Sequence, residues 1–178
     1  GVCSNAVQVC TGQGFEEPDY NEIDTYQDVE TECDGLDNDC DGTIDEASAS
    51  GAATWYRDAD SDTFGTLSTS QVSCSQPSGY VSSSTDCNDS DANTYPGAAS
   101  NDSSTACMTD VDGDGYGDDS PSAGVTAGSD CNDSDIGISP SATEVCDSVD
   151  NDCDGTIDES SASGAATWYR DADSDSYG

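Results

Sequence analysis

The sequence contains no lysine and no histidine, and its only cationic side chains are Arg57 and Arg170. Against these two stand 39 acidic residues, so the formal net charge at pH 7 is −37. A chain with this charge repels the phosphate backbone, which excludes nucleic acid as a partner. Two common acid–base residue types are missing and the carboxylates follow a repeat, so we expect no enzyme active site.

Large apolar residues are also scarce, since Leu, Ile, Val and Phe together number 19 of 178. In a highly charged chain this composition is typical of disorder, because too little apolar surface can be buried to offset chain entropy. No apolar run reaches 18 residues, so we expect no membrane insertion. No signal peptide begins at Gly1, which favours a processed or internal segment of a longer parent.

Two features argue against an acidic disordered linker. Asp accounts for 31 of the 39 acidic residues, and Asp is the shorter ligand that suits tight metal loops. There are also ten cysteines, an even number, which indicates a disulfide framework formed in an oxidising compartment. Zinc is the alternative use of these cysteines, but the sequence has neither His nor C-x-x-C. We therefore predict an extracellular or cell-surface protein.

The chain repeats itself. Residues 33–65 reappear as residues 146–178, a shift of 113 with 5 mismatches in 33 positions. We divide the chain into an N-terminal Cys/acidic module (1–46), two metal-binding repeat modules (47–108 and 109–159) and the start of a next repeat (160–178). The second copy stops before a counterpart of T-L-S-T-S-Q-V-S-C, so we expect a longer array.

Helical periodicity is nowhere sustained, because Gly, Pro, Asn, Asp and Ser interrupt every apolar stretch. The best candidates for regular structure are short strands at 71–74 and 79–82. The predicted fold class is an irregular, loop-rich tandem repeat stabilised by calcium and disulfides, with short β-strands and little helix.

The acidic loops have the spacing of calcium ligands. Calcium takes six to eight oxygens, and a loop with carboxylates at positions 1, 3 and 5, glycine at 6, a carbonyl at 7 and an acid at 9 can wrap one ion. Three loops fit: Asp37, Asp39, Asp41, Thr43 and Asp45; Asp110, Asp112, Asp114, Tyr116 and Asp118; and Asp150, Asp152, Asp154, Thr156 and Asp158. Two shorter loops are Asp58, Asp60 and Asp62 with the Phe64 carbonyl, and Asp171, Asp173 and Asp175 with the Tyr177 carbonyl. Glu46 or Glu159 could add an oxygen.

A second pattern, D-C-N-D-S-D, occurs twice and could complete sites shared with neighbouring loops. Its candidate ligands are Asp86, Asn88, Asp89 and Asp91, and Asp130, Asn132, Asp133 and Asp135. In total we expect about seven calcium ions, which would change the formal charge from −37 to −23 (−37 + 7 × 2). A single such loop is often only a solvated turn. No helical sequence flanks the loops, so EF-hands are not expected.

The series W-Y-R-D-A-D-S-D-T-F-G, C-S-Q-P-S-G-Y-V, D-C-N-D-S-D-A-N-T-Y-P-G-A and C-D-G-L-D-N-D-C-D-G-T-I-D-E closely resembles the metal-binding repeats of bacterial secreted proteins. That family is labelled after a copper-binding surface protein of methanotrophs. The chain is more distantly similar to the calcium-wrapped repeats of thrombospondin type 3 arrays. The resemblance implies an extracellular location, calcium and multi-copy arrays, but no single activity. Copper does not suit this chain, which lacks His and has one thioether, Met108.

We expect a calcium-binding extracellular structural protein that associates with itself head-to-tail in a filament or stalk. The alternative is a binding module, either a segment of a cell-surface adhesin or an acidic metal scavenger. Trp55 and Trp168, each followed by Tyr-Arg, either stack on sugar or another subunit, or pack within the repeat. Three asparagines begin N-D-S acceptors for attached glycans, of which Asn101 lies outside the metal loops; the others are Asn88 and Asn132.

Five disulfides between sequence neighbours are expected, because short-range pairing would let each module of a tandem array close alone. The predicted pairs are Cys3–Cys10, Cys33–Cys40, Cys74–Cys87, Cys107–Cys131 and Cys146–Cys153.

Overall fold

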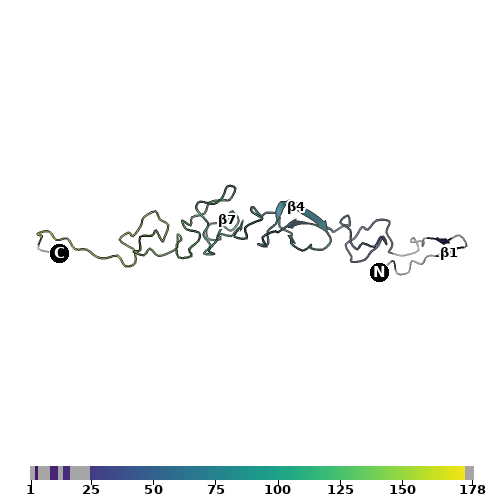
Figure 1. Ribbon diagram of the computed structural model, residues 1–178, viewed down its shortest axis with the longest axis horizontal. Helices are drawn as coiled ribbons and strands as arrows, with labels where there is room; N and C mark the ends of the chain where they lie inside the picture. Colours follow the sequence, from purple (N-terminus) through teal and green to yellow (C-terminus); the bar gives the residue numbers. More distant parts are fainter. Residues whose placement is uncertain (1–2, 4–8, 12–13, 17–24, 175–178) are drawn as a thin grey trace. The chain divides into compact units, whose positions relative to one another are not determined.

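The computed structural model describes residue 3 and residues 9–11, 14–16 and 25–174. The chain divides into two compact units, Gly1–Thr85 and Asp86–Gly178. The described residues contain no α-helix, and most of them lie in turns, bends and loops (Figure 1). No helix in this part of the chain has the length and apolarity needed to cross a membrane. The predicted irregular, loop-rich fold class is therefore confirmed.

Within the described residues, seven short strands form three small antiparallel sheets. In the first unit, β1 (Val9–Thr11) pairs with β2 (Gly14–Glu16), and a second sheet has the order β4-β3-β5. Its strands are β3 (Ala53–Arg57), β4 (Thr66–Ser73) and β5 (Tyr80–Val81). In the second unit, β6 (Thr94–Pro96) pairs with β7 (Cys107–Thr109). The expected strands at 71–74 and 79–82 correspond to the end of β4 and to β5.

The β4-β3-β5 sheet holds the first aromatic pair of the repeat. Trp55 and Tyr56 are half-buried on β3, and the Trp55 indole donates a hydrogen bond to the Ser73 carbonyl at 3.0 Å. The register between β3 and β4 shifts between Tyr56 and Arg57, which marks a bulge where the acidic loop begins. Trp55 and Tyr56 therefore pack within the repeat, which is one of the two alternatives that the sequence left open.

The interior of the protein is more polar than apolar. Among the described residues, the buried apolar ones are Ala49, Ala99, Met108, Ile138 and Ala162. The buried polar ones are Glu30, Asn38, Thr94, Asp130, Ser139, Glu144 and Asn151. Three of the five apolar residues are alanines, which bury little area, so the hydrophobic effect contributes little to this fold. Hydrogen bonds and disulfides therefore carry more of its stability than apolar packing does.

All five predicted disulfide pairs are wrong. The structure joins Cys3 to Cys40, Cys33 to Cys74, Cys87 to Cys107 and Cys131 to Cys153, and leaves Cys146 as an exposed free thiol. The cysteines of each C-x6-C pair thus do not bond to each other. The four bridges span 20 to 41 residues of sequence.

The physical reason is that the C-x6-C segment is itself a turn of an acidic loop. Its first cysteine, Cys33, lies against the Gly51 turn and bonds to the residue that follows β4, whereas its second, Cys40, bonds back to Cys3. Bridges between segments also constrain the unfolded chain more. By loop-closure entropy, a separation of 41 residues is worth about 1.5 kcal/mol more than one of seven.

Candidate metal centre

The acidic loops share one backbone geometry. Counted from the first aspartate, the fourth and sixth residues have positive φ in all four loops that are described throughout. The angles are 62° and 98° at Cys40 and Gly42, 73° and 79° at Ser61 and Thr63, 81° and 92° at Gly113 and Gly115, and 54° and 89° at Cys153 and Gly155. Ser174 repeats the fourth position of the fifth loop with 67°. Residues with side chains seldom adopt this conformation, so the recurrence shows one specific turn.

The D-x-D-x-D spacing follows from overlapping Asx turns. Asp112 accepts a hydrogen bond through Oδ1 from the amide of Asp114 at 3.1 Å, and Asp114 accepts one from the amide of Tyr116 at 2.8 Å. The same pattern joins Asp41 to the Thr43 amide and Asp62 to the Phe64 amide, both at 2.7 Å. Each carboxylate thus shapes the turn with one oxygen. In Asp112 and Asp114 the second oxygen, Oδ2, is buried and accepts no hydrogen bond, whereas Asp110 uses both oxygens to accept from the amides of Gly113 and Gly115.

In the second unit, carboxylates from two loops form a composite centre. Asp112 Oδ2, Asp114 Oδ2 and Asp130 Oδ2 are all buried and accept no hydrogen bond. Asp130 has no exposed surface. The bridge between Asp118 and Asp130, with a 2.8 Å bond from the Asp130 amide to the Gly117 carbonyl, brings the D-C-N-D-S-D loop against the first loop. Burying an unpaired carboxylate oxygen is costly unless a cation neutralises it, so these three oxygens fit a cation-binding site.

Electrostatics support this interpretation. Burial raises the pKa of Asp130, and the carboxylates of Asp114 and Asp112 raise it further, although the Asn132 amide opposes the shift. Burial also raises the pKa of Asp112, with its acidic neighbours adding to the effect. Several negative charges are therefore held close together at the centre. A divalent cation would remove this repulsion.

Asp133 joins the centre through the backbone of the first loop. Its Oδ1 accepts a hydrogen bond from the Val111 amide at 2.8 Å. Burial raises the pKa of Asp133 to about 6, and the carboxylates of Asp118 and Asp110 add to the shift against the Val111 bond. Asp135 instead uses Oδ1 to accept from the Gly137 amide at 3.1 Å.

A buried glutamate precedes each of the two acidic Cys loops (residues 33–46 and 146–159), and the sequence analysis did not predict either one. Glu30, 1% exposed, accepts a hydrogen bond from the Asn38 amide at 2.9 Å. Glu144, 4% exposed, accepts from the amides of Asn151 at 2.8 Å and Asp158 at 3.0 Å. The available signal was a glutamate two or three residues before the first cysteine of each C-x6-C segment.

This glutamate occupies different backbone positions in the two copies. The Ser50 amide donates to the Thr31 carbonyl, and the Ser163 amide donates to the Glu144 carbonyl, so the backbone of Thr31 corresponds to that of Glu144. Glu30 therefore reaches the equivalent place from one residue earlier. The carboxylate thus accepts from the equivalent amides of Asn38 and Asn151 in the two loops, although the two glutamates differ by one position in the sequence.

Glu30 also contributes to a candidate cation pocket. Carboxylate oxygens of Glu30, Asp39 and Glu46 lie within 4.8 Å of one another. Both Glu46 oxygens are buried and accept no hydrogen bond. The Glu46 amide lowers the pKa of its own carboxyl, but burial and the carboxylates of Asp39 and Asp41 outweigh it, so the pKa is raised. The negative charge around Glu46 thus outweighs the one backbone donor that opposes it.

The second copy repeats this arrangement. Glu159 Oε2 is buried without a hydrogen-bond partner. Burial raises the pKa of Asp152, and the carboxylates of Asp154, Glu159 and Glu144 add to the shift. Asp150 differs from its counterpart Asp37, since its two oxygens accept from the amides of Asp154 and Gly155, whereas Asp37 Oδ1 is buried and unpartnered.

The ninth-position aspartates close their loops. Asp45 Oδ1 accepts hydrogen bonds from the amides of Asp34 and Gly35 at 2.9 and 3.0 Å. Asp158 Oδ1 accepts from the corresponding amides, those of Asp147 and Ser148, at 2.9 and 3.1 Å. The structure thus gives both aspartates a positioning contact at the start of the loop, and their coordination of an ion stays a prediction.

The shorter loops have the same internal bonds. Carboxylate oxygens of Asp58, Asp60 and Asp62 lie within 4.8 Å of one another. Asp58 accepts from the Ser61 amide at 2.7 Å, and Asp171 accepts from the Ser174 amide at the same distance. Of the other residues predicted for the fifth loop, Asp173 is described, while Asp175 and Tyr177 lie outside the described residues.

The first D-C-N-D-S-D segment matches the second in its hydrogen bonds. Asp86 Oδ1 accepts from the Asn88 amide at 2.8 Å, as Asp130 does from that of Asn132. Asp91 Oδ2 accepts from the Thr94 hydroxyl at 2.9 Å. The ligand roles of this segment, which includes Asp89, stay predictions.

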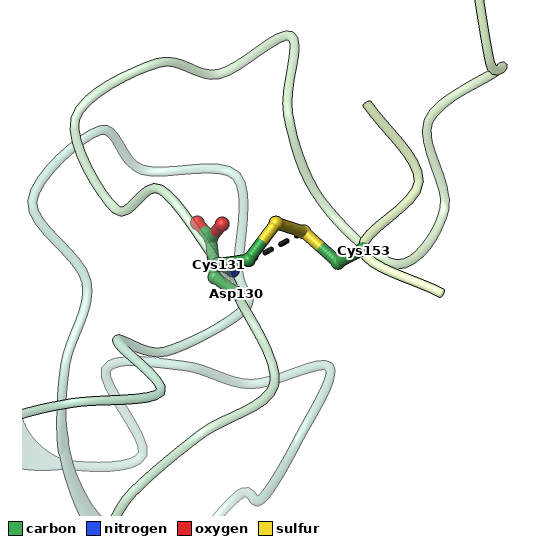
Figure 2. A group of neighbouring side chains, drawn as sticks. All are labelled: Asp130, Cys131 and Cys153. Atoms are coloured by element: carbon green, nitrogen blue, oxygen red, sulfur yellow. Dashed lines mark hydrogen bonds between the residues drawn. A yellow bond between two sulfur atoms is a disulfide. The ribbon is translucent and has the colours of Figure 1, made fainter. Parts of the chain in front are cut away.

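Sulfur does not contribute ligands at the composite centre. Asp130 lies beside Cys131 and Cys153, but these cysteines form a disulfide, and the Cys131 amide donates to Cys153 Sγ at 3.2 Å (Figure 2). A disulfide sulfur offers no thiolate to a metal. The donor set there consists of oxygen atoms, which suits hard cations.

Three segments of the chain are similar to a known family of repeats. Residues 21–46, 86–114 and 130–159 match the family of copper-binding MopE motifs, described as "Putative metal-binding motif". These three segments contain the acidic Cys loops, both D-C-N-D-S-D segments and the first three aspartates of the composite-centre loop. The resemblance seen in the sequence is thus confirmed for the repeats. No curated protein and no solved structure matches the chain.

Proposed function

We propose that this chain is a calcium-binding extracellular structural protein whose copies join head-to-tail in a filament or stalk. The observation that carries the proposal is the composite centre, where oxygens of Asp112, Asp114 and Asp130 are buried without partners. In a fold whose interior is mostly polar, these oxygens become stabilising only when a cation binds them. On this proposal the carboxylates are structural, and none is catalytic.

Calcium is the cation that this donor set favours. The candidate ligands are carboxylates and carbonyls, and calcium accepts six to eight such oxygens in flexible geometry. Copper prefers imidazole and thioether ligands. The chain has no His, and its only methionine, Met108, is buried with 6% of its surface exposed. Loops of this kind bind in the range of roughly 10⁻⁴ to 10⁻³ M in extracellular modules, a concentration that external calcium reaches.

The extracellular assignment is supported by the disulfides, and the filament by the repeat. Four bridges hold segments together, and such bridges persist in oxidising compartments. Two nearly identical copies spaced by 113 residues can present the same interface again and again, and a head-to-tail contact propagates unless its rotation closes a ring. Within this proposal, Asn101 is the candidate site for an attached glycan. Its side-chain amide donates a hydrogen bond to the Asp114 carbonyl at 3.0 Å.

The test compares the oxidised chain in calcium, in copper and in EDTA. Isothermal titration calorimetry measures binding, limited proteolysis reports the fold, and electron microscopy reports assembly. We expect calcium to bind at several sites, to protect the chain from proteolysis and to support filaments, and EDTA to reverse all three. Metal release without any change in proteolysis or shape would instead support a scavenger, and tighter binding of copper than of calcium would contradict the metal assignment.

A further inference from the structure

Asp102 joins the two loops of the composite centre, although it lies in neither of them. Its Oδ2 accepts hydrogen bonds from the amides of Gly117 and Ser129, both at 2.9 Å, and its Oδ1 accepts one from the Ser129 hydroxyl at 2.5 Å. Gly117 lies in the 110–118 loop, and Ser129 immediately precedes Asp130. One carboxylate thus holds two segments that are 15 and 27 residues away from it in the sequence.

A tight turn presents Asp102 to these partners. The Asp102 amide donates to the Ala99 carbonyl at 3.1 Å, and Ala99 has no exposed surface. A Cβ on Gly117 would lie only 3.0 Å from the Ala99 Cβ, so the turn is seated directly against the loop. The Asn101 amide adds a hydrogen bond to the Gly115 carbonyl at 2.8 Å. The backbone that carries the Asp102 carboxylate is therefore fixed to the first loop.

The two loops meet closely beside Asp102. The Asp130 amide donates to the Gly117 carbonyl at 2.8 Å. A Cβ on Gly128 would collide with that same carbonyl, so the two backbones pass each other where only glycine fits. Ser129 lies between these two contacts, and its hydrogen bonds to Asp102 fix the middle of the joint. The residue that follows the joint is Asp130, with its buried, unpartnered Oδ2.

The corresponding position in the first unit has a simpler acceptor. Gly65 is the eighth residue of its loop, as Gly117 is of the 110–118 loop, and the Gly65 amide donates to the Ser83 carbonyl at 3.2 Å. In the second unit a charged side chain replaces this neutral carbonyl, and it also binds Ser129. Hydrogen bonds to a charged acceptor are stronger than those to a neutral one. Asp102 therefore makes a firm link between the loops.

Asp102 differs in its electrostatics from the carboxylates of the centre. Burial acts to raise its pKa, but the hydrogen bonds from Ser129 and Gly117 outweigh burial, so the pKa of Asp102 is lowered. The pKa values of Asp112 and Asp130 are raised instead. Hydrogen-bond donors thus stabilise the charge of Asp102 without a cation, which suits a supporting role better than that of a ligand.

We propose that Asp102 is a positioning residue for calcium: it holds the two loops in register, so that Asp130 meets the carboxylates of the 110–118 loop, and does not ligate the ion. This inference rests on the proposed calcium binding and explains how a centre made from two loops is assembled. A site that is arranged before the ion arrives binds it more tightly, because less ordering remains to be done. Removing hydrogen bonds that orient metal ligands typically weakens metal binding by about 10–100-fold.

The test measures calcium affinity at the composite centre of the intact, oxidised chain. Amide hydrogen exchange of residues 110–118 and 130–135 is followed across a calcium titration, and the midpoint of protection reports the affinity of this centre. Residues 150–158 report a separate acidic loop of the same unit. Asp102→Ala removes all three side-chain hydrogen bonds, so its midpoint at the centre should shift to calcium concentrations at least about tenfold higher. The midpoint at residues 150–158 should not change.

Asp102→Asn separates positioning from charge. The asparagine keeps a carbonyl oxygen for the two amides, and its NH₂ group can donate to the Ser129 hydroxyl, which turns to accept. Its midpoint should therefore shift by less than about threefold, because a single charge near the surface contributes little. Asp119→Ala is the charge control, since it removes one negative charge from an exposed neighbour of the centre, and it should leave the midpoint unchanged.

Ser129→Ala is a milder variant, because it removes the hydroxyl partner of Asp102 and keeps the amide. Its midpoint should shift by about two- to fivefold, as expected for the loss of one hydrogen bond. In the Asp102→Ala background it should cause no further shift, since the partner is already gone. If Asp102→Ala does not fold, an unchanged midpoint in Ser129→Ala overturns the proposal.

The remaining outcomes separate this inference from the proposed function. Equal midpoints in the natural chain and in Asp102→Ala would overturn the positioning role and leave calcium binding in place. An equal loss in Asp102→Ala and Asp102→Asn would also overturn it, because charge or ligation would then matter rather than the hydrogen bonds. A shift of the same size at residues 150–158 would show a general loss of fold, again against the proposal. Absence of calcium-dependent protection in the natural chain would refute the proposed function together with this inference.

Discussion

Asp130→Asn should have opposite effects with and without calcium. The asparagine retains Oδ1, so it still accepts the hydrogen bond from the Asn132 amide at 2.8 Å. It replaces the fully buried, unpartnered Oδ2 by an uncharged amide group. Without calcium, the substitution relieves the repulsion from Asp114 and Asp112 that raises the pKa of Asp130, so the second unit should gain stability. With calcium, a charged ligand is lost.

The magnitude follows from binding linkage. If the site binds at about 10⁻⁴ M, calcium at 10 mM stabilises the folded unit by about 2.7 kcal/mol. Loss of one carboxylate ligand is expected to weaken binding about tenfold, because ligand charge is the main determinant of calcium affinity. The stabilisation then falls to about 1.4 kcal/mol, so the variant loses about 1.3 kcal/mol of calcium-dependent stability.

Amide hydrogen exchange measures this effect locally in the intact chain. The reporters are the amides of residues 110–118 and 130–135, followed in EDTA and in 10 mM calcium. Asp119→Asn is the matched control, since it removes the same charge from an exposed neighbour of the centre. Equal calcium-dependent protection in the natural sequence, the variant and the control would refute the assignment of Asp130 as a ligand.

Three further predictions concern strain, hydrogen bonding and pH. Thr63→Gly should stabilise the first unit by up to about 1 kcal/mol in chemical denaturation, because a β-branched residue is strained at φ of 79°; no gain, or a loss as in the control Thr43→Gly, would contradict this. Glu144→Gln should cost about 1.5–3 kcal/mol and loosen its loop to proteolysis, since charged acceptor oxygens bind three backbone amides; unchanged proteolysis would show that the charge is not needed. Without metal, the raised pKa of Asp133 means that the folded unit binds more protons than the unfolded chain between about pH 4 and 6, so its hydrogen-exchange protection should fall as pH rises through that window; in calcium it should rise instead, and the same slope in both conditions would count against a metal at this centre.

The local chemistry of the loops was readable from the sequence because it depends on residues close together in the chain. An aspartate reaches the amide two residues later in an Asx turn, so the D-x-D-x-D spacing of 110–114 predicts both the turn and the orientation of carboxylates. The interruption of every apolar stretch by Gly, Pro, Asn, Asp or Ser likewise predicted an irregular fold with short strands and little helix. Neither conclusion needed knowledge of distant contacts.

Cysteine pairing could not be read in this way. The C-x6-C spacing suggested local bridges, but Cys33 bonds 41 residues away to Cys74, and Cys40 bonds back to Cys3. Which cysteines meet depends on the course of the backbone between them, where many alternatives have similar local energies. The buried glutamates were missed for the same reason, since Glu30 and Glu144 serve one purpose from non-equivalent backbone positions.

The sequence by itself determined the acidic loops and the 113-residue repeat, because both rest on spacing along the chain. Only the tertiary structure decided that Asp130 enters a centre with Asp112 and Asp114, since that depends on the bridge between Asp118 and Asp130. It also decided which cysteines pair, because Cys33 and Cys74 meet only through the course of the backbone between them.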